Sequence, residues 1–287
     1  MPVLVPTTLS ETLVALDDHP SATLLAGGTD SMVEYNEGRA RPSDTVIALS
    51  RVAELRAWRH DPAEGTLRVG AGVTWTELME VPPAALVPAL AEAARTVGSP
   101  QIRNTGTLGG NVATCSPAGD GLPVLSALGA TVQLASPEGE RSVPIDELMI
   151  GVKRTALRPG ELITAVTLPV LEGWQGYAKV GVRNAMVIAV ASVCVALDRA
   201  AGTAAIALGS VGPTVLRAAE AEALVVAAID WETLAITDDT LTRIASLVSA
   251  AAQPIDDHRS TADYRRHAVG VLTRRLLGRA RSAGVTS

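Results

Sequence analysis

The sequence predicts an α+β protein of two domains, and three observations support this prediction. Hydrophobic residues make up 47% of the 287 positions, so the chain can bury a sizeable core and is not disordered. Strand and helix patterns are mixed up to about residue 170, and the pattern changes at the glycine-containing stretch 171–176. Beyond it, three strand patterns precede three helix patterns, which is typical of an α+β unit. We therefore expect domains at 1–170 and 171–287, the first divided into subdomains at about 1–54 and 55–170.

The first subdomain opens with alternating strand and helix patterns. We expect strands at 3–5, 22–26 and 45–49, a helix at 10–16 and the start of a short helix at 29–30. This order is typical of a small parallel sheet. Asp30 is expected to cap the short helix through its side chain.

The rest of the first domain contains both element types. We expect strands at 55–58, 66–69, 131–134, 141–143 and 162–168, and helices at 75–79, 86–97 and 121–128. The glycine-rich stretch between the last two helices is expected to be a loop. In the second domain, residues 171–176 form the expected linker. The strands that follow are expected at 177–182, 187–197 and 203–208, and the helices at 216–228, 238–251 and 261–279.

Composition and charge exclude several classes of protein. The net charge is −6 and no basic cluster is flanked by aromatic residues, which argues against nucleic-acid binding. The only cysteines, Cys115 and Cys194, lie far apart, so this chain alone predicts neither a zinc knuckle nor an iron–sulfur cluster. The start of the chain does not resemble a signal peptide, and the longest apolar stretch, 187–197, is too short to span a bilayer. We expect a cytoplasmic protein without a membrane span.

Two stretches rich in Gly, Thr, Ser and Asn are the candidate binding site. The first glycine stretch is LLAGGTDS at 24–31, and the second glycine stretch is VGSPQIRNTGTLGGNVATCSPAGD at 97–120. Residues without a Cβ let main-chain N–H groups approach a diphosphate, which then needs no Lys or Arg. Gly27, Gly28, Gly109 and Gly110 meet this need, and short polar donors stand beside them at Thr29, Thr107 and Asn111. From chemistry alone, ordinary turns are as good an interpretation as a phosphate site.

The order of these motifs resembles the FAD-binding subunit of the molybdenum hydroxylases, the xanthine dehydrogenase and carbon monoxide dehydrogenase family. The resemblance runs from about residue 1 to 280. The segments that carry it are AGGTD at 26–30, IRN at 102–104, TLGGN at 107–111, SP at 116–117 with Asp120, GELITAVTLP at 160–169, the lysine of YAKVGVRNA at 177–185, and ADYRRH at 262–267.

The resemblance implies a PCMH-type FAD-binding domain of two subdomains, followed by a small flavoprotein domain with a three-stranded antiparallel sheet. It implies that residues 25–30 line the FAD diphosphate, that Gly119 and Asp120 face the adenosine half, and that Lys179 lies near the flavin. A loop around Met186 is expected over the flavin. No catalytic residue and no metal ligand is expected in this chain. The residues that the resemblance assigns to the cofactor are Leu25, Ala26, Gly27, Gly28, Thr29, Asp30, Val97, Gly98, Thr107, Gly110, Asn111, Ala113, Gly119, Asp120, Ile163 and Lys179.

The function implied by the resemblance is electron transfer within a larger complex. This chain would hold FAD, while a large subunit holds the molybdenum cofactor and a small subunit holds two [2Fe–2S] clusters, in an (αβγ)2 assembly. Electrons would pass to NAD or another acceptor, and the substrate, a purine or N-heterocycle, would be oxidised in the large subunit. Two alternatives are a stand-alone FAD oxidoreductase of the MurB and aryl-alcohol oxidase fold type, and a non-catalytic binding protein that has lost its cofactor.

Overall fold

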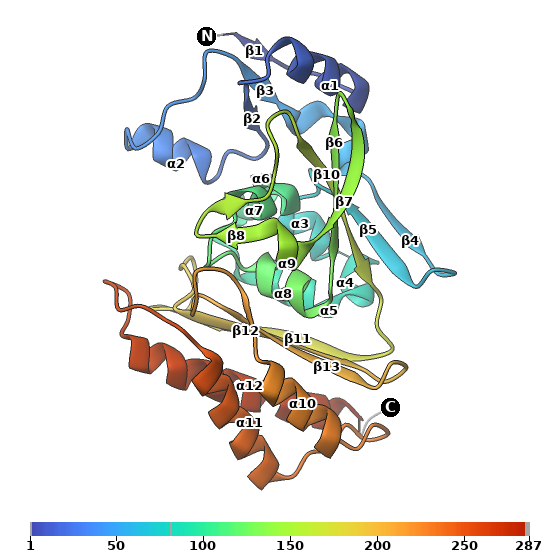
Figure 1. Cartoon of the computed structure of the whole chain (residues 1–287), viewed down its shortest axis with the longest axis vertical. Helices are drawn as coiled ribbons and strands as arrows, with labels where there is room; N and C mark the ends of the chain where they lie inside the picture. Colours follow the sequence, from blue (N-terminus) through green and yellow to red (C-terminus); the bar gives the residue numbers. More distant parts are fainter. Residues whose placement is uncertain (1, 81, 285–287) are drawn as a thin grey trace.

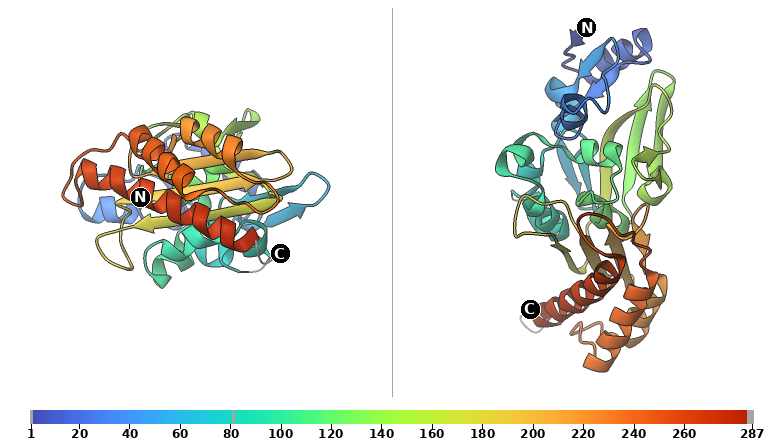
Figure 2. Two further views of the ribbon diagram at one scale, coloured as in Figure 1. Left: turned by 90° about the horizontal axis from the view of Figure 1, so that it is seen from below. Right: turned by 90° about the vertical axis from the view of Figure 1, so that its left-hand side faces the viewer.

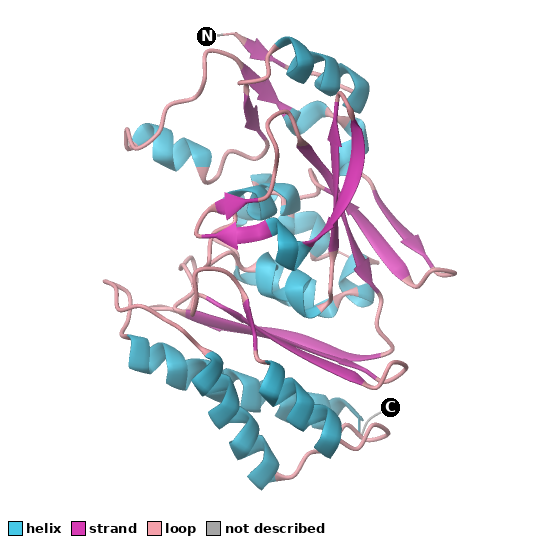
Figure 3. Ribbon diagram, in the orientation of Figure 1, coloured by secondary structure: helices cyan, strands magenta, loops and turns pink. Residues whose placement is uncertain are grey.

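The structure, a computed structural model, describes residues 2–80 and 82–284. Three sheets follow one another along the long axis of the molecule, as Figure 1 shows: a small parallel sheet, a five-stranded sheet with helices at its side, and a four-stranded sheet backed by helices. Strands and helices alternate in the first part and are segregated in the last (Figure 3). This is the α+β architecture expected from the sequence.

The first sheet contains only parallel pairs, in the strand order β1-β3-β2. Its elements are β1 (Val3–Leu4), α1 (Leu9–Asp18), β2 (Thr23–Leu25), α2 (Ser31–Asn36) and β3 (Val46–Ala48). The expected parallel sheet is therefore confirmed. Asp30 precedes α2 but its side chain makes no capping hydrogen bond, so the expected cap is wrong. None of the α2 residues is buried, and an ion pair between Glu34 and Lys153 joins this helix to the middle of the molecule.

The middle sheet is antiparallel, in the strand order β4-β5-β10-β6-β7. Its strands are β4 (Trp58–Asp61), β5 (Thr66–Gly70), β6 (Thr131–Ser136), β7 (Gly139–Pro144) and β10 (Leu162–Pro169). The strand expected at 55–58 is wrong. Residues Ala53–Arg56 form a 3-10 helix instead, which buries Leu55 in the core, and the strand starts at Trp58. Another 3-10 helix lies at Leu49–Arg51, and a small hairpin is made by β8 (Met149–Gly151) and β9 (Arg154–Thr155).

Short helices pack beside this sheet. They are α3 (Trp75–Leu78), α4 (Pro83–Leu86), α5 (Pro88–Thr96), α6 (Pro100–Thr105), α7 (Leu108–Thr114), α8 (Gly121–Ala127) and α9 (Ile145–Leu148). The second glycine stretch is therefore not a loop, because it contains α6 and α7. Each of these two helices begins at a hydroxyl cap: Ser99 accepts a hydrogen bond from the Ile102 N–H (3.4 Å), and Thr107 accepts one from the Gly110 N–H (3.0 Å).

The last sheet is antiparallel, in the order β11-β12-β13-β14. Its elements are β11 (Gly173–Val180), β12 (Ala191–Asp198), β13 (Thr203–Gly209), β14 (Leu216–Arg217), α10 (Ala219–Ala228), α11 (Asp238–Ala251) and α12 (Ala262–Gly284). Three expectations need correction: β11 starts inside the expected linker, residues 187–190 precede β12 rather than belonging to it, and 216–217 form a fourth strand before the helix.

Each face of the last sheet has its own apolar partner. The helices α10, α11 and α12 cover one face, as the right view of Figure 2 shows. They enclose a separate core that includes Val193, Ile206 and Val269. The other face packs on α5 and α8, and its residue Cys194 belongs to the larger core. This contact fixes the loop between β11 and β12 near α5 and α6. No helix of the described chain has both the length and the apolar character needed to cross a bilayer.

Candidate functional site

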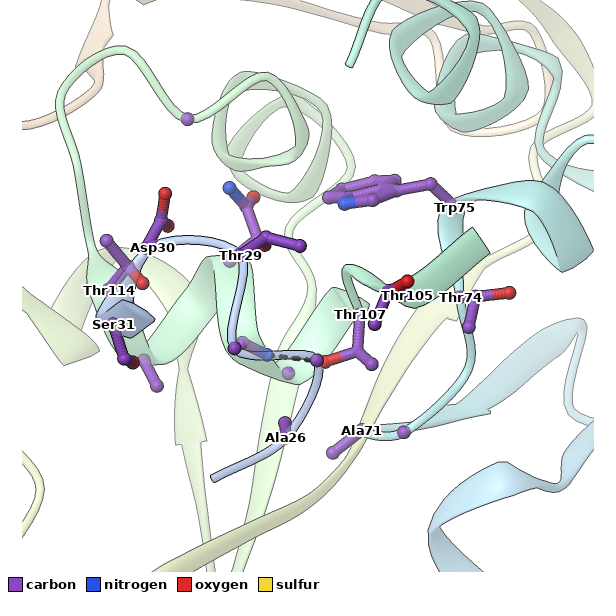
Figure 4. A pocket seen from close by; sticks show the side chains of 18 of the residues that line it. Ala26, Thr29, Asp30, Ser31, Ala71, Thr74, Trp75, Thr105, Thr107 and Thr114 are labelled. Atoms are coloured by element: carbon purple, nitrogen blue, oxygen red, sulfur yellow. Dashed lines mark hydrogen bonds between the residues drawn. The ribbon is translucent and has the colours of Figure 1, made fainter. Parts of the chain in front are cut away.

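The two glycine stretches line one cavity of about 590 Å³, which lies between the first sheet and the helices α6 and α7. Figure 4 shows side chains of both stretches, among them Thr29 and Thr107, around the same hollow. Gly28 and Gly110 both line it. The expectation that the two stretches close on a common hollow is therefore confirmed.

The two stretches also touch each other through their main chains. A Cβ on Gly27 would lie 1.9 Å from the Thr105 carbonyl oxygen and 3.0 Å from the Gly106 Cα. A Cβ on Gly106 would in turn lie 3.3 Å from the Thr29 Oγ1. The distances of 1.9 Å and 3.0 Å leave no room for a side chain at position 27. Glycine is required there because the second stretch occupies the space.

The first glycine stretch keeps its main-chain donors available. Among the residues that the structure describes, the N–H groups of Gly27, Gly28 and Thr29 have no hydrogen-bond acceptor. Gly28 has a φ of +69°, a left-handed conformation that residues with a Cβ rarely adopt. Successive N–H groups in such a bend point into one concavity and attract an anion. This stretch has the properties expected of a diphosphate cradle.

The second glycine stretch uses its main-chain donors internally. The Gly109 N–H donates to the Ala71 carbonyl oxygen (2.8 Å), and the Gly110 N–H donates to the Thr107 Oγ1 (3.0 Å). A Cβ on Gly109 would lie 2.5 Å from the Ala71 Cβ, so this glycine is needed for packing. The expectation that N–H groups of both stretches are available to a ligand is therefore wrong for Gly109 and Gly110.

Side chains take the place of main-chain donors in the second stretch. The Asn111 Oδ1 is buried and has no hydrogen-bond partner within the described chain, and Asn111 lines the cavity. The hydroxyls of Thr107 and Thr114 belong to residues of the same wall. A Cβ on Gly110 would meet only the Thr107 Oγ1, at 3.0 Å, and would enter a cradle that is otherwise open. An unpartnered carboxamide oxygen beside an open cradle indicates that a polar ligand completes the site.

Most of the residues assigned from the sequence line this cavity. Leu25 and Lys179 do not. Leu25 ends β2, and Lys179 lines a second cavity that adjoins the first. The expected loop over the site is present, since Met186 and its neighbours line the first cavity. The assigned residues in the wall are Ala26, Gly27, Gly28, Thr29, Asp30, Val97, Gly98, Thr107, Gly110, Asn111, Ala113, Gly119, Asp120 and Ile163.

Asp120 and Lys179 form a buried ion pair instead of facing a ligand separately. The Lys179 Nζ donates to the Asp120 Oδ2 (2.7 Å), to the Thr96 carbonyl oxygen (2.8 Å) and to the Val187 carbonyl oxygen (3.2 Å). The Tyr177 hydroxyl donates to the Asp120 Oδ1 (2.7 Å). Burial raises the pKa of the Asp120 carboxyl, against the opposing effects of Lys179 and Tyr177. Burial likewise holds the pKa of the Tyr177 phenol well above its usual value, so the phenol remains a donor.

One further carboxylate lines the cavity. Glu161 is held by Arg141, whose Nε and Nη2 donate to its two oxygens at 2.5 Å and 2.8 Å. The hydrogen bond from Arg141 lowers the pKa of Glu161, which therefore stays charged and paired. The described residues contain no group of three or more His, Cys, Asp or Glu that could hold a metal ion.

Sequence reasoning missed part of the wall. Ala71, Gly72, Thr74 and Trp75 line the cavity from the turn after β5 and the start of α3. The Trp75 ring also fills the space beside Gly121, where a Cβ would lie 2.7 Å from the ring. The signal was present as Gly-Ala-Gly between a strand and a helix. A Cβ on Gly70 or Gly72 would lie 2.3 Å or 3.1 Å from the Leu55 carbonyl oxygen, so these glycines let two main-chain segments meet at the cavity wall. Because Gly-Ala-Gly does not match the full dinucleotide-binding fingerprint, the sequence did not identify this segment as part of the site.

Two family descriptions match the chain, and together they cover most of it. Residues 1–171 match the family described as FAD binding domain in molybdopterin dehydrogenase. Residues 177–280 match the CO dehydrogenase flavoprotein C-terminal domain. The cavity described above lies largely within the first match.

Individual proteins agree with these matches over nearly the full length. The glyceraldehyde dehydrogenase medium chain of Sulfolobus acidocaldarius is 33% identical over 92% of this chain and 92% of its own. A solved carbon monoxide dehydrogenase from Hydrogenophaga pseudoflava is 30% identical, with a TM-score of 0.87 over 99% of this chain and 98% of that chain. Quinoline 2-oxidoreductase from Pseudomonas putida 86 is 27% identical, with a TM-score of 0.89 over 99% and 98%.

Proposed function

This chain belongs to the FAD-binding subunits of the molybdenum hydroxylase family, and we propose that it binds FAD in the cavity between its two glycine stretches and acts as an electron-transfer subunit. In this proposal it accepts electrons from [2Fe–2S] clusters of a partner subunit and passes them to NAD or another acceptor. Bound FAD supplies the two-electron redox chemistry, and the protein supplies position and electrostatics.

The observation that carries the proposal is the combination of unused N–H groups in the first stretch and an unpartnered Asn111 Oδ1 in the second. The N–H groups of Gly27, Gly28 and Thr29 would bind the diphosphate. The Thr107 hydroxyl and the Asn111 Nδ2 would donate from the opposite wall, and the unpartnered Asn111 Oδ1 would accept from a hydroxyl group of the cofactor. Ile163 and the main chain at 97–98 would pack against a ring of the cofactor. The remaining assigned residues, Leu25, Ala26, Asp30, Gly110, Ala113 and Gly119, are proposed to shape this site.

Asp120 and Lys179 are proposed to act by position. Because both Asp120 oxygens already accept hydrogen bonds, this carboxylate is better placed to fix Lys179 than to bind an adenosine. Lys179 also holds the Val187 carbonyl oxygen, and Val187 lines the first cavity. The pair thus fixes the loop at the cavity. Because Asp120 compensates the charge of Lys179, the pair adds no net positive charge there.

Partner subunits complete the proposed function. Both cysteines of this chain are buried and separate, so clusters and molybdenum cofactor would belong to other chains. The relative from Sulfolobus acidocaldarius is named a medium chain, which supports a large molybdenum-cofactor subunit and a small iron–sulfur subunit around this one. We propose an (αβγ)2 assembly in the cytoplasm.

The substrate would be oxidised in the large subunit, outside this chain. A purine or N-heterocycle is the class that we propose to assay first, and the likeness to quinoline 2-oxidoreductase supports it. The assay requires the assembled complex, because no residue of the medium chain would contact the substrate.

Flavin loading tests the proposal. The purified chain, refolded or expressed with FAD, should show visible flavin absorbance at a stoichiometry of about one per chain. Asn111→Ala should lower the FAD affinity by about tenfold or more, since it removes a buried polar partner, while a surface change such as Glu64→Ala should leave it unchanged. A chain without flavin absorbance would contradict the proposal. Turnover of a small substrate by the chain alone would favour a stand-alone oxidoreductase instead.

A further inference from the structure

A buried guanidinium group lies outside the site, near the start of α12. Of the charged residues that the structure describes, only Asp120 and Arg265 are buried, and Arg265 is 4% exposed. Arg265 lines neither the first nor the second cavity. Burying a charge is costly unless its hydrogen-bonding groups find partners. The partners of Arg265 therefore indicate which parts of the molecule it holds.

Arg265 joins three segments that are far apart in the sequence. Its Nη1 donates to the Val190 carbonyl oxygen (2.7 Å) and to the Ser210 carbonyl oxygen (3.0 Å). Its Nη2 donates to the Asp257 Oδ1 (2.7 Å), which compensates the charge. Val190 directly precedes β12, Ser210 directly follows β13, and Asp257 lies between α11 and α12. A guanidinium group can hold all three because its N–H donors point in fixed directions.

The bond to Val190 anchors the loop at the first cavity. This loop, 181–189, leaves β11 and rejoins the sheet at Val190, whose N–H donates to the Val180 carbonyl oxygen (2.8 Å). The loop residues that line the cavity are Met186, Val187 and Ile188. Arg265 therefore holds the residue at which this loop ends.

The bond to Ser210 connects Arg265 to the second glycine stretch. The Ser210 N–H donates to the Pro117 carbonyl oxygen (2.8 Å), and the neighbours Ser116 and Ala118 line the first cavity. Ser210 has a φ of +63°, a left-handed conformation that is uncommon for a residue with a Cβ. Such a conformation persists only where the surrounding contacts hold it. Arg265 and Pro117 provide those contacts on the two sides of Ser210.

We propose that Arg265 is a positioning residue for the first cavity, which fixes the loop 181–189 and the end of the second glycine stretch relative to each other through Val190 and Ser210. The inference rests on the proposed function, since the wall that these segments form would be a wall of the FAD site. Stabilising α12 alone would require only the bond to Asp257. The two carbonyl oxygens belong instead to residues whose main chain leads directly to the cavity wall.

Cleavage by trypsin after Arg183 measures how firmly the loop is held. Arg183 is exposed within the loop, and Arg39, exposed after α2, is an internal reference site. In the flavin-free chain, Arg265→Gln should raise the rate of cleavage after Arg183 by about tenfold, because losing a charge-assisted hydrogen bond changes the population of the open loop by about that factor. The rate of cleavage after Arg39 should change by less than about twofold.

Flavin binding supplies the second measurement. Arg265→Gln should raise the Kd of FAD by about tenfold and change the visible circular dichroism of the flavin at saturating FAD. Val269→Ala, one turn further along α12, is the matched control: Val269 is buried in the separate core, so the urea midpoint should fall while the Kd and the cleavage after Arg183 change by less than about twofold. Arg265→Lys keeps the charge without the planar donors and should give about a threefold rise in Kd.

Flavin absorbance of the wild type is recorded first, so failures can be told apart. A wild-type chain that takes up no flavin would refute the proposed function and this inference with it. A flavin-loaded wild type whose Arg265 variants behave like Val269→Ala would overturn the inference alone. So would a change in cleavage after Arg183 without a change in flavin binding, or the reverse, because loop and cofactor would then not be linked. Failure of both Arg265 variants to fold would show a purely structural role and would also overturn it.

Discussion

The two glycine stretches that line the first cavity have similar sequences and opposite uses of the main chain. In the first, the N–H groups of Gly27 and Gly28 have no acceptor among the described residues. In the second, the N–H groups of Gly109 and Gly110 are already bonded, to Ala71 and to the Thr107 side chain. The first stretch can therefore bind an anion directly, while the second positions side chains around it.

This difference shows that glycine pairs with the same sequence can have different structural roles. Gly28 adopts a left-handed φ of +69°. Gly27 lacks a Cβ where the Thr105 carbonyl oxygen lies, and Gly109 lacks one where Ala71 lies. At Gly110 a Cβ would meet only the Thr107 Oγ1 and would extend into the cavity. Substitutions at these positions should therefore have separable effects on folding and on cofactor binding, and they provide a direct test of the comparison.

The largest effect is expected for Gly27→Ala. The new Cβ would lie 1.9 Å from the Thr105 carbonyl oxygen, which is main chain and cannot rotate away. The two stretches would have to separate, at a cost of about 3 kcal/mol in the free energy of unfolding, and FAD binding should be lost. Urea unfolding of the flavin-free chain and flavin content after loading measure the two effects. Unchanged stability would mean that the stretches do not touch as described.

Gly28→Ala and Gly110→Ala should then separate strain from occupation of the cradle. Gly28→Ala forces a Cβ into the left-handed region, so the unfolding free energy should fall by about 1–2 kcal/mol together with FAD affinity. Gly110→Ala lies in a helix, where alanine is favoured by about 1 kcal/mol, so stability should not fall. Its Cβ nevertheless enters the cradle, and the Kd of FAD should rise by about tenfold, about 1.4 kcal/mol.

Gly278→Ala is the matched control for this pair. Gly278 is also helical, and a Cβ there would meet nothing within 4 Å. It should leave FAD affinity unchanged. If Gly110→Ala behaved like Gly278→Ala in flavin binding, the second stretch would not face the cofactor, and the comparison between the two stretches would fail.

The sequence predicts the elements that local pattern determines. The parallel sheet at the start and the strands of the last domain follow from periodicity and turn residues. The antiparallel order of the last sheet and the common hollow of the two glycine stretches are implied by the family resemblance. The sequence does not predict α6 and α7, because Gly, Pro and Asn are poor helix formers. These helices form because tertiary hydrogen bonds hold them, such as that from the Leu108 N–H to the Val73 carbonyl oxygen (3.0 Å).

The ion pair between Asp120 and Lys179 likewise cannot be predicted from local sequence pattern. Asp120 and Lys179 are separated by 59 residues, and only the packing of the last sheet on α5 and α8 brings them together. In the sequence, each residue has the properties of a ligand-binding charge. In the structure, the two residues form an ion pair with each other. Arg95 of α5, Arg103 of α6 and Arg183 of the loop between β11 and β12 line the second cavity for the same reason.

The smallest effects are expected from removing the hydroxyls of Thr29 and Thr107. These variants compare one side chain from each glycine stretch. Thr107→Val removes the acceptor of the Gly110 N–H and should lower the free energy of unfolding by about 1 kcal/mol. Thr29 lines the cavity, and no hydrogen bond of its hydroxyl is found within the described chain, so Thr29→Val should leave the free energy of unfolding unchanged. Both should raise the Kd of FAD by about threefold to tenfold, since each loses a hydroxyl that lines the cavity.

Thr107→Ser is the control that restores the hydroxyl, and it should recover both stability and affinity. Thermal unfolding of the flavin-free chain and flavin titration distinguish the two positions. The expected result is that Thr29 matters only when flavin is present, whereas Thr107 matters with and without it. Equal loss of stability in both valine variants would show that the first stretch, like the second, is held by its own side chains, and that its N–H groups are not kept available for a ligand.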